Sequence, residues 1–485
     1  MSSRIKFMGI LCALTALMPM LPAMADQPIS RGRQLLLERG LQIQALVFFD
    51  QPGVKNPDIA RFQSAHFTAI NLWETQNPKL RSQLPPNMLW SRDYIPGKPA
   101  SYLFPEELPY LPQLVNLQYS DEIQDFSPQI LNEIATTFQD WKKNYPKMLA
   151  YTNFGGPNGY ISGTDLSHFM KVTQPDMLSF DIYPYRYGMP MATWYSMMQL
   201  YRTAALDGYT VDGQNSGPLP YAQYVYTVLG TADTPLHTES YIRLQQNASW
   251  AFGYTFITAF TYNSYNATLP ASMFKGMGDA HPTPLFDVVK ETNRQSLNLG
   301  PALVRLLSTD VRIMIGRIPS DDPRNPNGDP KWLPDRLNST KMTNGHPYIT
   351  NIKAENIGDT NYQVVESGKK NPLPGDVLLG YFKTLENAPC GPGAEKEAYF
   401  MVVNALIEPE NAPAGDTHQR ITLSFDFKET GIKSLQRLSR DTGKVEVIPL
   451  IHDGGGRYHI ELVLNGGEGD LFKFNTGTPF VSDVQ

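Results

Sequence analysis

Cysteine is nearly absent from this sequence. The 485 residues contain two cysteines, Cys12 and Cys390, and Cys12 lies within an apolar N-terminal run. If that run is a leader removed on export, Cys390 is the only cysteine left and no internal disulfide can form. Stability must then come from burial of a large core, for which the chain is long enough, and more than one domain is expected.

Other signals are missing as well. No lysine or arginine cluster stands out in a chain of formal net charge −6, which argues against a nucleic-acid partner. Neither H-x-H nor H-E-x-x-H spacing occurs, so the sequence offers no metal site, and no cofactor is expected. No glycine-rich loop follows the first predicted strand, which counts against a dinucleotide-binding sheet.

The first 25 residues have the composition of a secretory signal peptide. Arg4 and Lys6 precede an apolar run of roughly 15 residues, which is short of the ~20 needed to span a bilayer. Ala23-Met24-Ala25 then forms an A-x-A cleavage site. We expect cleavage after Ala25, a periplasmic or secreted mature protein, and no membrane association after cleavage. The alternative is an uncleaved N-terminal anchor.

Between about residues 43 and 265, short β-prone runs alternate with stretches of helical periodicity. Most runs are continuously apolar, as expected for parallel strands buried on both faces, and segment 128–146 has amphipathic helical spacing. The predicted strands are 44–50, 67–74, 87–93, 113–122, 147–154, 176–185, 208–216 and 253–263. Eight strands with helical crossovers predict an α/β fold of the (β/α)8, or TIM-barrel, type. A doubly wound open sheet is the alternative.

The pattern changes after the predicted barrel. Residues 282–311 indicate one long helix, interrupted near Gly300-Pro301, and residues 317–347 are rich in Pro, Asn, Asp and Gly, as irregular loops are. From residue 348 onward, short alternating strands separated by turns predict a smaller all-β sandwich. We therefore divide the chain into a leader (1–25), a catalytic barrel (26–311), a loop-rich linker (312–347) and a β-sandwich (348–485).

The working groups of such a barrel sit at the C-terminal ends of its strands. At these ends the sequence is rich in carboxylates, amides and aromatic rings, and poor in histidine and cysteine. Glycoside hydrolysis requires this set, because two carboxylates act on the bond while amides bind hydroxyls and rings stack on the sugar. The residues at the predicted ends are Asp50, Trp73, Arg92, Asp121, Glu122, Asn153, Asp181, Tyr183, Tyr185, Asp212, Gln214 and Asn263.

Several stretches, in their order, resemble secreted glycoside hydrolases of the (β/α)8 class. More narrowly, they are similar to bacterial barrel proteins whose fourth strand ends in Asp-Glu-Pro; here the motif is Ser120-Asp121-Glu122-Ile123, with the proline replaced. The other similar stretches are "YTNF" (151–154), "PDMLSFDIYPY" (175–185), residues 237–262, residues 293–311, and the closing stretches "GKVEVIPL" (443–450) and "GEGDLFKF" (467–474). The resemblance covers nearly the whole mature chain and implies a carbohydrate substrate.

The resemblance also implies that Glu122 is the general acid/base. Its side chain is longer than that of Asp121 and reaches further into the mouth, and a neighbouring carboxylate favours the protonated form that a donor needs. Asp121, on the opposite parity of the strand, is expected to hydrogen-bond the barrel wall. The alternative is a solvent-exposed strand end whose acids suit the start of a helix.

The second carboxylate has three candidates. Retaining enzymes of this type usually place a glutamate at the end of strand seven, and we expect retention; the predicted strand 208–216 offers Asp212 instead. Glu239 follows in the next loop or first helical turn, where an acid beside a Thr238 cap is also routine. Asp181, at the end of strand six, is the third candidate. If none opposes Glu122, the alternative is a protein that binds sugars without cleaving them.

Further residues are predicted to bind the substrate. Aromatic walls of sugar subsites are expected from Trp73, Tyr183, Tyr185 and Tyr262, although plain packing is the alternative role for each. Asn153 and Gln214 are expected to bind hydroxyls. The competing functions are a non-catalytic carbohydrate-binding barrel and, from another class, a metal-dependent carbohydrate esterase or deacetylase that uses the same mouth.

The leader generates the first prediction. Exported protein should begin near Asp26, because cleavage follows the Ala23-Met24-Ala25 site. N-terminal sequencing of material from the periplasm or medium measures this directly, and an intact Met1 on exported protein would contradict it.

Overall fold

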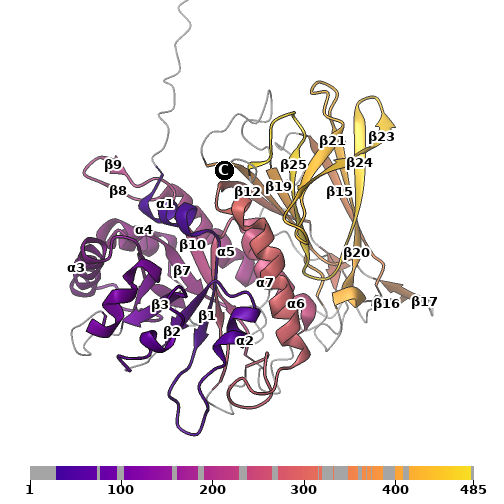
Figure 1. Ribbon diagram of the computed structural model, residues 1–485. Coiled ribbons are helices and arrows are strands. Elements are labelled where there is room, and N and C mark those ends of the chain that lie inside the picture. Colours follow the sequence, from indigo (N-terminus) through magenta and orange to yellow (C-terminus); the bar gives the residue numbers. More distant parts are fainter. Residues whose placement is uncertain are drawn as a thin grey trace, which may run out of the picture.

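The protein folds into a barrel and a β-sandwich that pack against each other, with α6 and α7 between them (Figure 1). The computed structural model describes residues 29–73, 77–94, 103–155, 161–183, 191–228, 238–264, 271–314, 316–318, 331–332, 348–358, 363–366, 369–372, 374–385, 399–407 and 414–481. Within these ranges, no helix has both the length and the apolar character needed to cross a membrane.

The barrel is a closed parallel sheet. Its strands are β1 (Gln42–Val47), β2 (Ala69–Leu72), β3 (Leu89–Tyr94), β4 (Leu114–Tyr119), β5 (Leu149–Tyr151), β6 (Asn153–Gly155), β7 (Leu178–Asp181), β10 (Tyr221–Tyr226) and β11 (Phe256–Phe260). The sheet order is β5-β4-β3-β2-β1-β11-β10-β7-β6. β5 and β6 are one extended segment interrupted at Thr152, which pairs with β4 on one edge and β7 on the other. The predicted (β/α)8 barrel is therefore confirmed.

Helices cover the outside of the barrel. They are α1 (Arg31–Arg39), α2 (Ile59–Ser64), α3 (Pro128–Asn144), α4 (Gly163–Thr173), α5 (Met191–Asp207), α6 (Glu239–Phe252) and α7 (Pro284–Leu303), with short 3₁₀ turns at Arg81–Gln83 and Pro105–Gln113. α1 precedes β1 and closes the N-terminal end of the barrel, where Arg33 donates to the carbonyls of Pro218 and Leu219. Apolar side chains of α1 and the strand starts form one cluster there.

The predicted seventh strand is wrong. Residues 208–216 contain a short exposed hairpin, β8 (Thr210–Val211) and β9 (Gln214–Asn215), and the true seventh strand is β10. The hairpin turn is Asp212-Gly213, and both residues have positive φ, 51° and 77°. This is the geometry that an Asp-Gly pair favours in a two-residue hairpin loop. The other seven predicted strands overlap observed barrel strands.

The predicted long helix is also too long. α7 ends at Leu303, two residues after Pro301, and residues 306–314 form β12 (Leu306–Met314) of the second domain. The C-terminal sheet therefore begins before the predicted boundary at residue 311. Most of the predicted linker 312–347 lies outside the described residues, apart from strand pair β13 (Arg317–Ile318) and β14 (Lys331–Trp332).

The C-terminal part is the predicted β-sandwich. One sheet holds β12, β18 (Val377–Thr384), β19 (Tyr399–Asn404), β25 (Gly469–Phe474), β21 (Ser434–Leu438) and β22 (Val445–Pro449) in that order. The other holds β15 (Ile349–Asn356), β20 (Gln419–Asp426), β24 (Arg457–Leu464) and β23 (Ile451–Gly454). A separate ribbon pairs β16 (Gln363–Glu366) with β17 (Lys369–Pro372). An apolar cluster that includes Phe400 and Phe425 fills the space between the two sheets.

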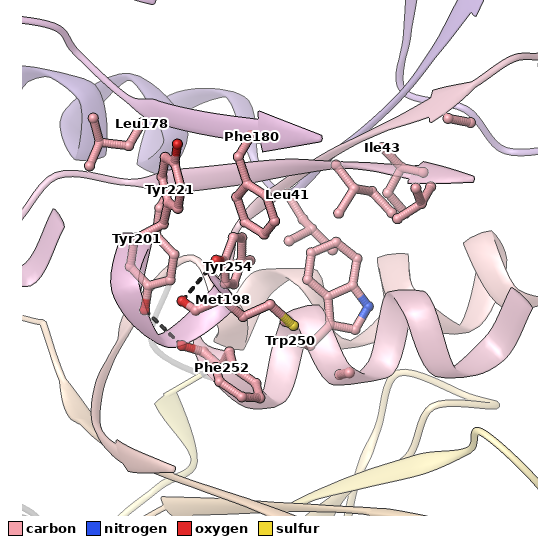
Figure 2. Close-up of a cluster of buried hydrophobic side chains, with 14 of the residues drawn as sticks. Leu41, Ile43, Leu178, Phe180, Met198, Tyr201, Tyr221, Trp250, Phe252 and Tyr254 are labelled. Carbon is pink, nitrogen blue, oxygen red and sulfur yellow. Dashed lines mark hydrogen bonds between the residues drawn. The ribbon is translucent and has the colours of Figure 1, made fainter. Parts of the chain in front are cut away.

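The two domains share an apolar core. α6 lies between them, and nearly all of its residues are buried. On its barrel side, Trp250 and Phe252 pack near Phe180, Tyr221 and Tyr254, and the Tyr221 hydroxyl donates to the Phe252 carbonyl at 2.8 Å (Figure 2). On its other side, one continuous apolar cluster runs into β18 and β19. An apolar interface therefore joins the two domains.

The close approach of α6 to β18 generates the second prediction. A Cβ added at Gly380 would lie 1.9 Å from the Ala251 carbonyl oxygen. Gly380→Ala should therefore force the domains apart and lower the free energy of unfolding by about 1–3 kcal/mol, measured by thermal or denaturant unfolding. Gly415→Ala is the matched control, because nothing lies within 4 Å of its added Cβ. Equal stability of the two variants would show that the interface is not tight.

Candidate active site

Strand β4 ends in an unusual backbone turn. Ser120 and Glu122 both have left-handed φ, 54° and 46°, on either side of Asp121. Such a conformation costs about 1–3 kcal/mol for a residue other than glycine. The turn breaks the alternation of the strand, which would place the two neighbouring carboxylates on opposite faces. Asp121 accepts hydrogen bonds from side chains of the barrel interior, and the Glu122 side chain extends over β6. Both carboxylates therefore lie at the mouth of the barrel.

Asp121 is anchored to the barrel wall. Its Oδ1 accepts hydrogen bonds from the side-chain amides of Gln118, at 3.2 Å, and Asn153, at 2.9 Å. The residue keeps an exposed edge, but its carboxylate lies among protein atoms, and this desolvation raises the pKa of Asp121 to about 6. The nearby carboxylates of Glu122 and Asp93 raise it further, and the two amide donors oppose the shift.

Glu122 meets Asp181 in the space above Gly155. A Cβ added at Gly155 would lie 1.5 Å from Asp181 Oδ1 and 3.1 Å from Glu122 Cγ, so both side chains occupy the place of the missing side chain. The two carboxyl groups are within hydrogen-bonding reach. Burial raises the pKa of Asp181 well above its usual value, and the charges of Asp121 and Glu122 add to the shift.

A polar network inside the barrel supports these acids. Gln118 Oε1 accepts the hydroxyls of Tyr151 and Tyr224, at 2.8 and 2.6 Å, while its amide nitrogen donates to Asp121. Deeper in the barrel, Gln44 donates to Asn116 and accepts from Ser91. Side chains in a network of this kind have few alternative positions, so the orientation of Asp121 is defined by the barrel interior.

Aromatic side chains form a buried cluster beside Asp181. Trp73 and Tyr183 belong to one buried cluster with Tyr224 and Tyr226. The rings of Tyr183 and Tyr226 are 4.7 Å apart between centroids, and the Tyr183 hydroxyl donates to Asp181 Oδ2 at 3.4 Å. The structure therefore brings together Trp73, Tyr183, Asn153, Asp181 and Glu122 of the predicted residues. Tyr185 lies outside the described residues.

Two predicted residues lie at the opposite end of the barrel. Asp212 and Gln214 belong to the β8–β9 hairpin, which connects α5 to the start of β10, near α1 (Figure 1). They were placed in the site because the hairpin was interpreted as strand seven. No carboxylate of this hairpin can face Glu122, so that expectation for Asp212 and Gln214 is corrected.

Glu239 and Tyr262 have other partners. Glu239 is the first residue of α6; its Oε1 accepts from Arg243 at 2.7 Å and its Oε2 accepts the backbone N–H of Ala414 in the second domain. Its carboxylate therefore stabilises the contact between the two domains. Tyr262 is fully buried behind strand β11, where its ring packs on Phe62 and Phe274 and cannot reach a sugar. Both residues are assigned structural roles.

Other residues of the site were missed in the sequence. Asp93, on β3, is close enough to Asp121 to raise its pKa, whereas the preceding Arg92 pairs with Glu107, at 3.4 Å, and lies over the ring of Phe104. The alternation Leu89, Ser91, Asp93 along β3 is the signal that could have found Asp93. Gly155 and Gln118 had no such signal, because their roles depend on neighbouring strands.

The site shows no arrangement of metal ligands. Within the part of the chain that the structure describes, no three side chains of His, Cys, Asp or Glu are placed to hold a metal ion.

Comparison with known proteins gives likenesses of fold only. No protein-family model matches the sequence, and no match is found among curated proteins. Among solved structures, a family 39 glycoside hydrolase from Bacteroides cellulosilyticus is similar at 11% identity and a TM-score of 0.39, with 92% of this chain and 82% of that chain covered.

Two other structures are similar to about the same degree. An endo-β-1,4-mannanase from Thermotoga petrophila has 9% identity and a TM-score of 0.36, covering 91% of this chain and 99% of that one. A GH2 β-galacturonidase from Eisenbergiella tayi has 13% identity and a TM-score of 0.38, covering 52% of this chain and only 51% of that one. With scores this low, the fold assignment rests on the strand order of the chain itself.

The pKa of Asp121 generates the third prediction. Its folded pKa of about 6 exceeds the usual 3.8, so the folded state binds the proton more tightly and loses stability as the pH rises between these values. Asp121→Asn removes this loss while its amide oxygen still accepts from Gln118 and Asn153. The melting temperature of the variant should match that of the wild type at pH 4 and exceed it at pH 7.

Asp212→Asn is the control, because it removes an exposed carboxylate at the other end of the barrel. A constant difference between Asp121→Asn and wild type across this pH range would show that Asp121 titrates alike in the folded and unfolded chains.

Proposed function

We propose that this protein is an exported glycoside hydrolase that cleaves an O-glycosidic bond in a poly- or oligosaccharide, with Glu122 as the general acid/base. The observation that supports this most directly is the meeting of Glu122 and Asp181 at the C-terminal mouth of a (β/α)8 barrel, above Gly155. Catalytic groups of such barrels sit at this end. The predicted signal peptide supports export.

The neighbouring groups suit a sugar ring. Trp73, Tyr183 and Tyr226 form a buried aromatic cluster that is joined to Asp181 through the Tyr183 hydroxyl, and aromatic rings are the groups on which the C–H face of a pyranose packs. Asp121, which accepts from the Asn153 amide, supplies a carboxylate that can bind a hydroxyl. A protonated Glu122 would donate its proton to the glycosidic oxygen as the bond to the anomeric carbon breaks.

Asp181 is too close to Glu122 to act as the nucleophile in this arrangement. Retaining enzymes place the two carboxyl groups ~5–5.5 Å apart, which leaves room for the sugar. Inverting enzymes place them ~6.5–9.5 Å apart, which leaves room for the sugar and a water molecule. Asp181 and Glu122 both lie against the same point above Gly155, Oδ1 at 1.5 Å and Cγ at 3.1 Å from an added Cβ, which leaves no such space between them. We therefore assign Asp181 to the control of Glu122. Retention remains our expectation; it requires a nucleophile other than Asp212, Glu239 and Asp181, and the anomer formed first, observed by proton NMR, tests it.

The fourth prediction concerns Glu122. After a panel of polysaccharides and aryl glycosides has identified a substrate, Glu122→Gln should reduce kcat on the unactivated substrate by about 10²–10⁴-fold, because the amide cannot donate the proton. Aryl glycosides with good leaving groups need little protonation and should be affected far less. Added azide should restore turnover of these only if a separate nucleophile is present.

Asp212→Asn is the control here too and should keep the wild-type rate. Wild-type turnover of an unactivated substrate by Glu122→Gln would refute the assignment. Measurable sugar binding without cleavage by the wild-type protein would instead favour the non-catalytic carbohydrate-binding barrel.

A further inference from the structure

Where Asp181 meets Glu122, a buried carboxylate oxygen is left without a hydrogen-bond donor. Asp181 is 9% exposed, and its Oδ1 accepts no hydrogen bond from any described donor. A buried carboxylate oxygen without a donor is unfavourable by about 1–3 kcal/mol or more. The group that faces it is the carboxyl of Glu122. Two ionised carboxylates are both acceptors, so the contact becomes a hydrogen bond only when one of them carries a proton.

We propose that Asp181 and Glu122 hold one proton between them, and that Gly155 is the positioning residue that makes this pair possible. The inference deepens the function proposed above, since Glu122 is the acid in both. Any side chain at position 155 would occupy the space of the Asp181 carboxyl, because an added Cβ would lie 1.5 Å from its Oδ1.

The surroundings favour a retained proton. The titratable groups that face the pair are Asp121 from the end of β4, with Asp93 of β3 beyond it, and the hydroxyls of Tyr183, Tyr201 and Tyr224. The carboxylates disfavour a second negative charge, and burial raises the pKa of Asp181 well above its usual value. Hydrogen bonds from Asn153 and from the Tyr183 hydroxyl oppose this, because they favour the ionised form of Asp181.

A proton held between Asp181 and Glu122 is available to the glycosidic oxygen through Glu122. In the reaction, the proton leaves the Asp181–Glu122 pair through Glu122 and bonds to the glycosidic oxygen as the bond from that oxygen to the anomeric carbon breaks, and the pair becomes doubly ionised. Water then bonds through its oxygen to the anomeric carbon, which gives the sugar its hydroxyl group, and the second proton of the water returns to the pair through Glu122. The pair titrates in two steps that belong to both groups, so loss of Asp181 should remove the step that keeps the acid protonated at higher pH.

The fifth prediction uses a readout that needs no substrate. At pH 8, where Asp121 is mostly ionised, the infrared difference spectrum between wild type and Asp181→Asn should contain the C=O band of one protonated carboxyl group. Other buried acids, such as Glu107, cancel in this difference. The same band should be lost in Glu122→Gln and in Gly155→Ala. Absence of the band from the wild-type difference would overturn the proposal.

Two further measurements keep the test decisive. Asp181→Asn is close to isosteric, so this variant should fold even if Gly155→Ala does not. Gly163→Ala is the matched glycine control, because its added Cβ would meet only Leu200, at 3.5 Å. On any cleaved substrate, Asp181→Asn should shift the alkaline limb of kcat/KM by about one pH unit or more toward acid, a roughly tenfold loss at pH 8.

An equal loss at every pH would assign Asp181 a merely structural role and overturn the proposal. The two hypotheses also fail separately: a protonated pair in a protein that cleaves no glycoside refutes the proposed function, and glycosidase activity without the infrared band refutes the shared proton.

Discussion

Segment 149–155 hydrogen-bonds along both of its edges, and the site depends on this. Through β5 it pairs with β4, and through β6 it pairs with β7, so strands that bear Glu122 and Asp181 become its two neighbours. At the junction, the Thr152 hydroxyl donates to the Tyr119 carbonyl at 2.6 Å. The two carboxyls then meet above Gly155, the one residue of the segment without a side chain at that level.

The interior of the barrel contains polar side chains that position the acids of the mouth and that stabilise the fold less than an apolar filling would. A polar layer that includes Gln44, Gln118 and Tyr224 lies where branched apolar residues usually fill such barrels. Two left-handed residues near Asp121 and a buried carboxyl at Asp181 add further strain and desolvation. The apolar core around α6, shared with the β-sandwich, offsets these unfavourable terms.

Much of the fold was predictable because burial on both faces produces continuous apolar runs. Seven barrel strands and the change to a β-sandwich follow from local pattern. The errors also have local causes: the Asp212-Gly213 turn made a hairpin resemble a strand, and the apolar residues after Pro301 continued a helical pattern into β12. The Asp-Gly turn and Pro301 both signalled a break in the sequence, but the apolar residues around them gave the stronger pattern.

The sequence by itself determined which side chains leave the ends of strands four, five and six, because alternation and strand length are local properties. Glu122, Asn153 and Asp181 were found in this way, as was Trp73 at the end of strand two. The tertiary structure alone decided which of them touch. Barrel closure brings Glu122 and Asp181 together, the missing side chain of Gly155 makes room for them, and pairing with Arg243 and Ala414 takes Glu239 to the domain interface. Such contacts join residues far apart in the chain, and no local pattern records them.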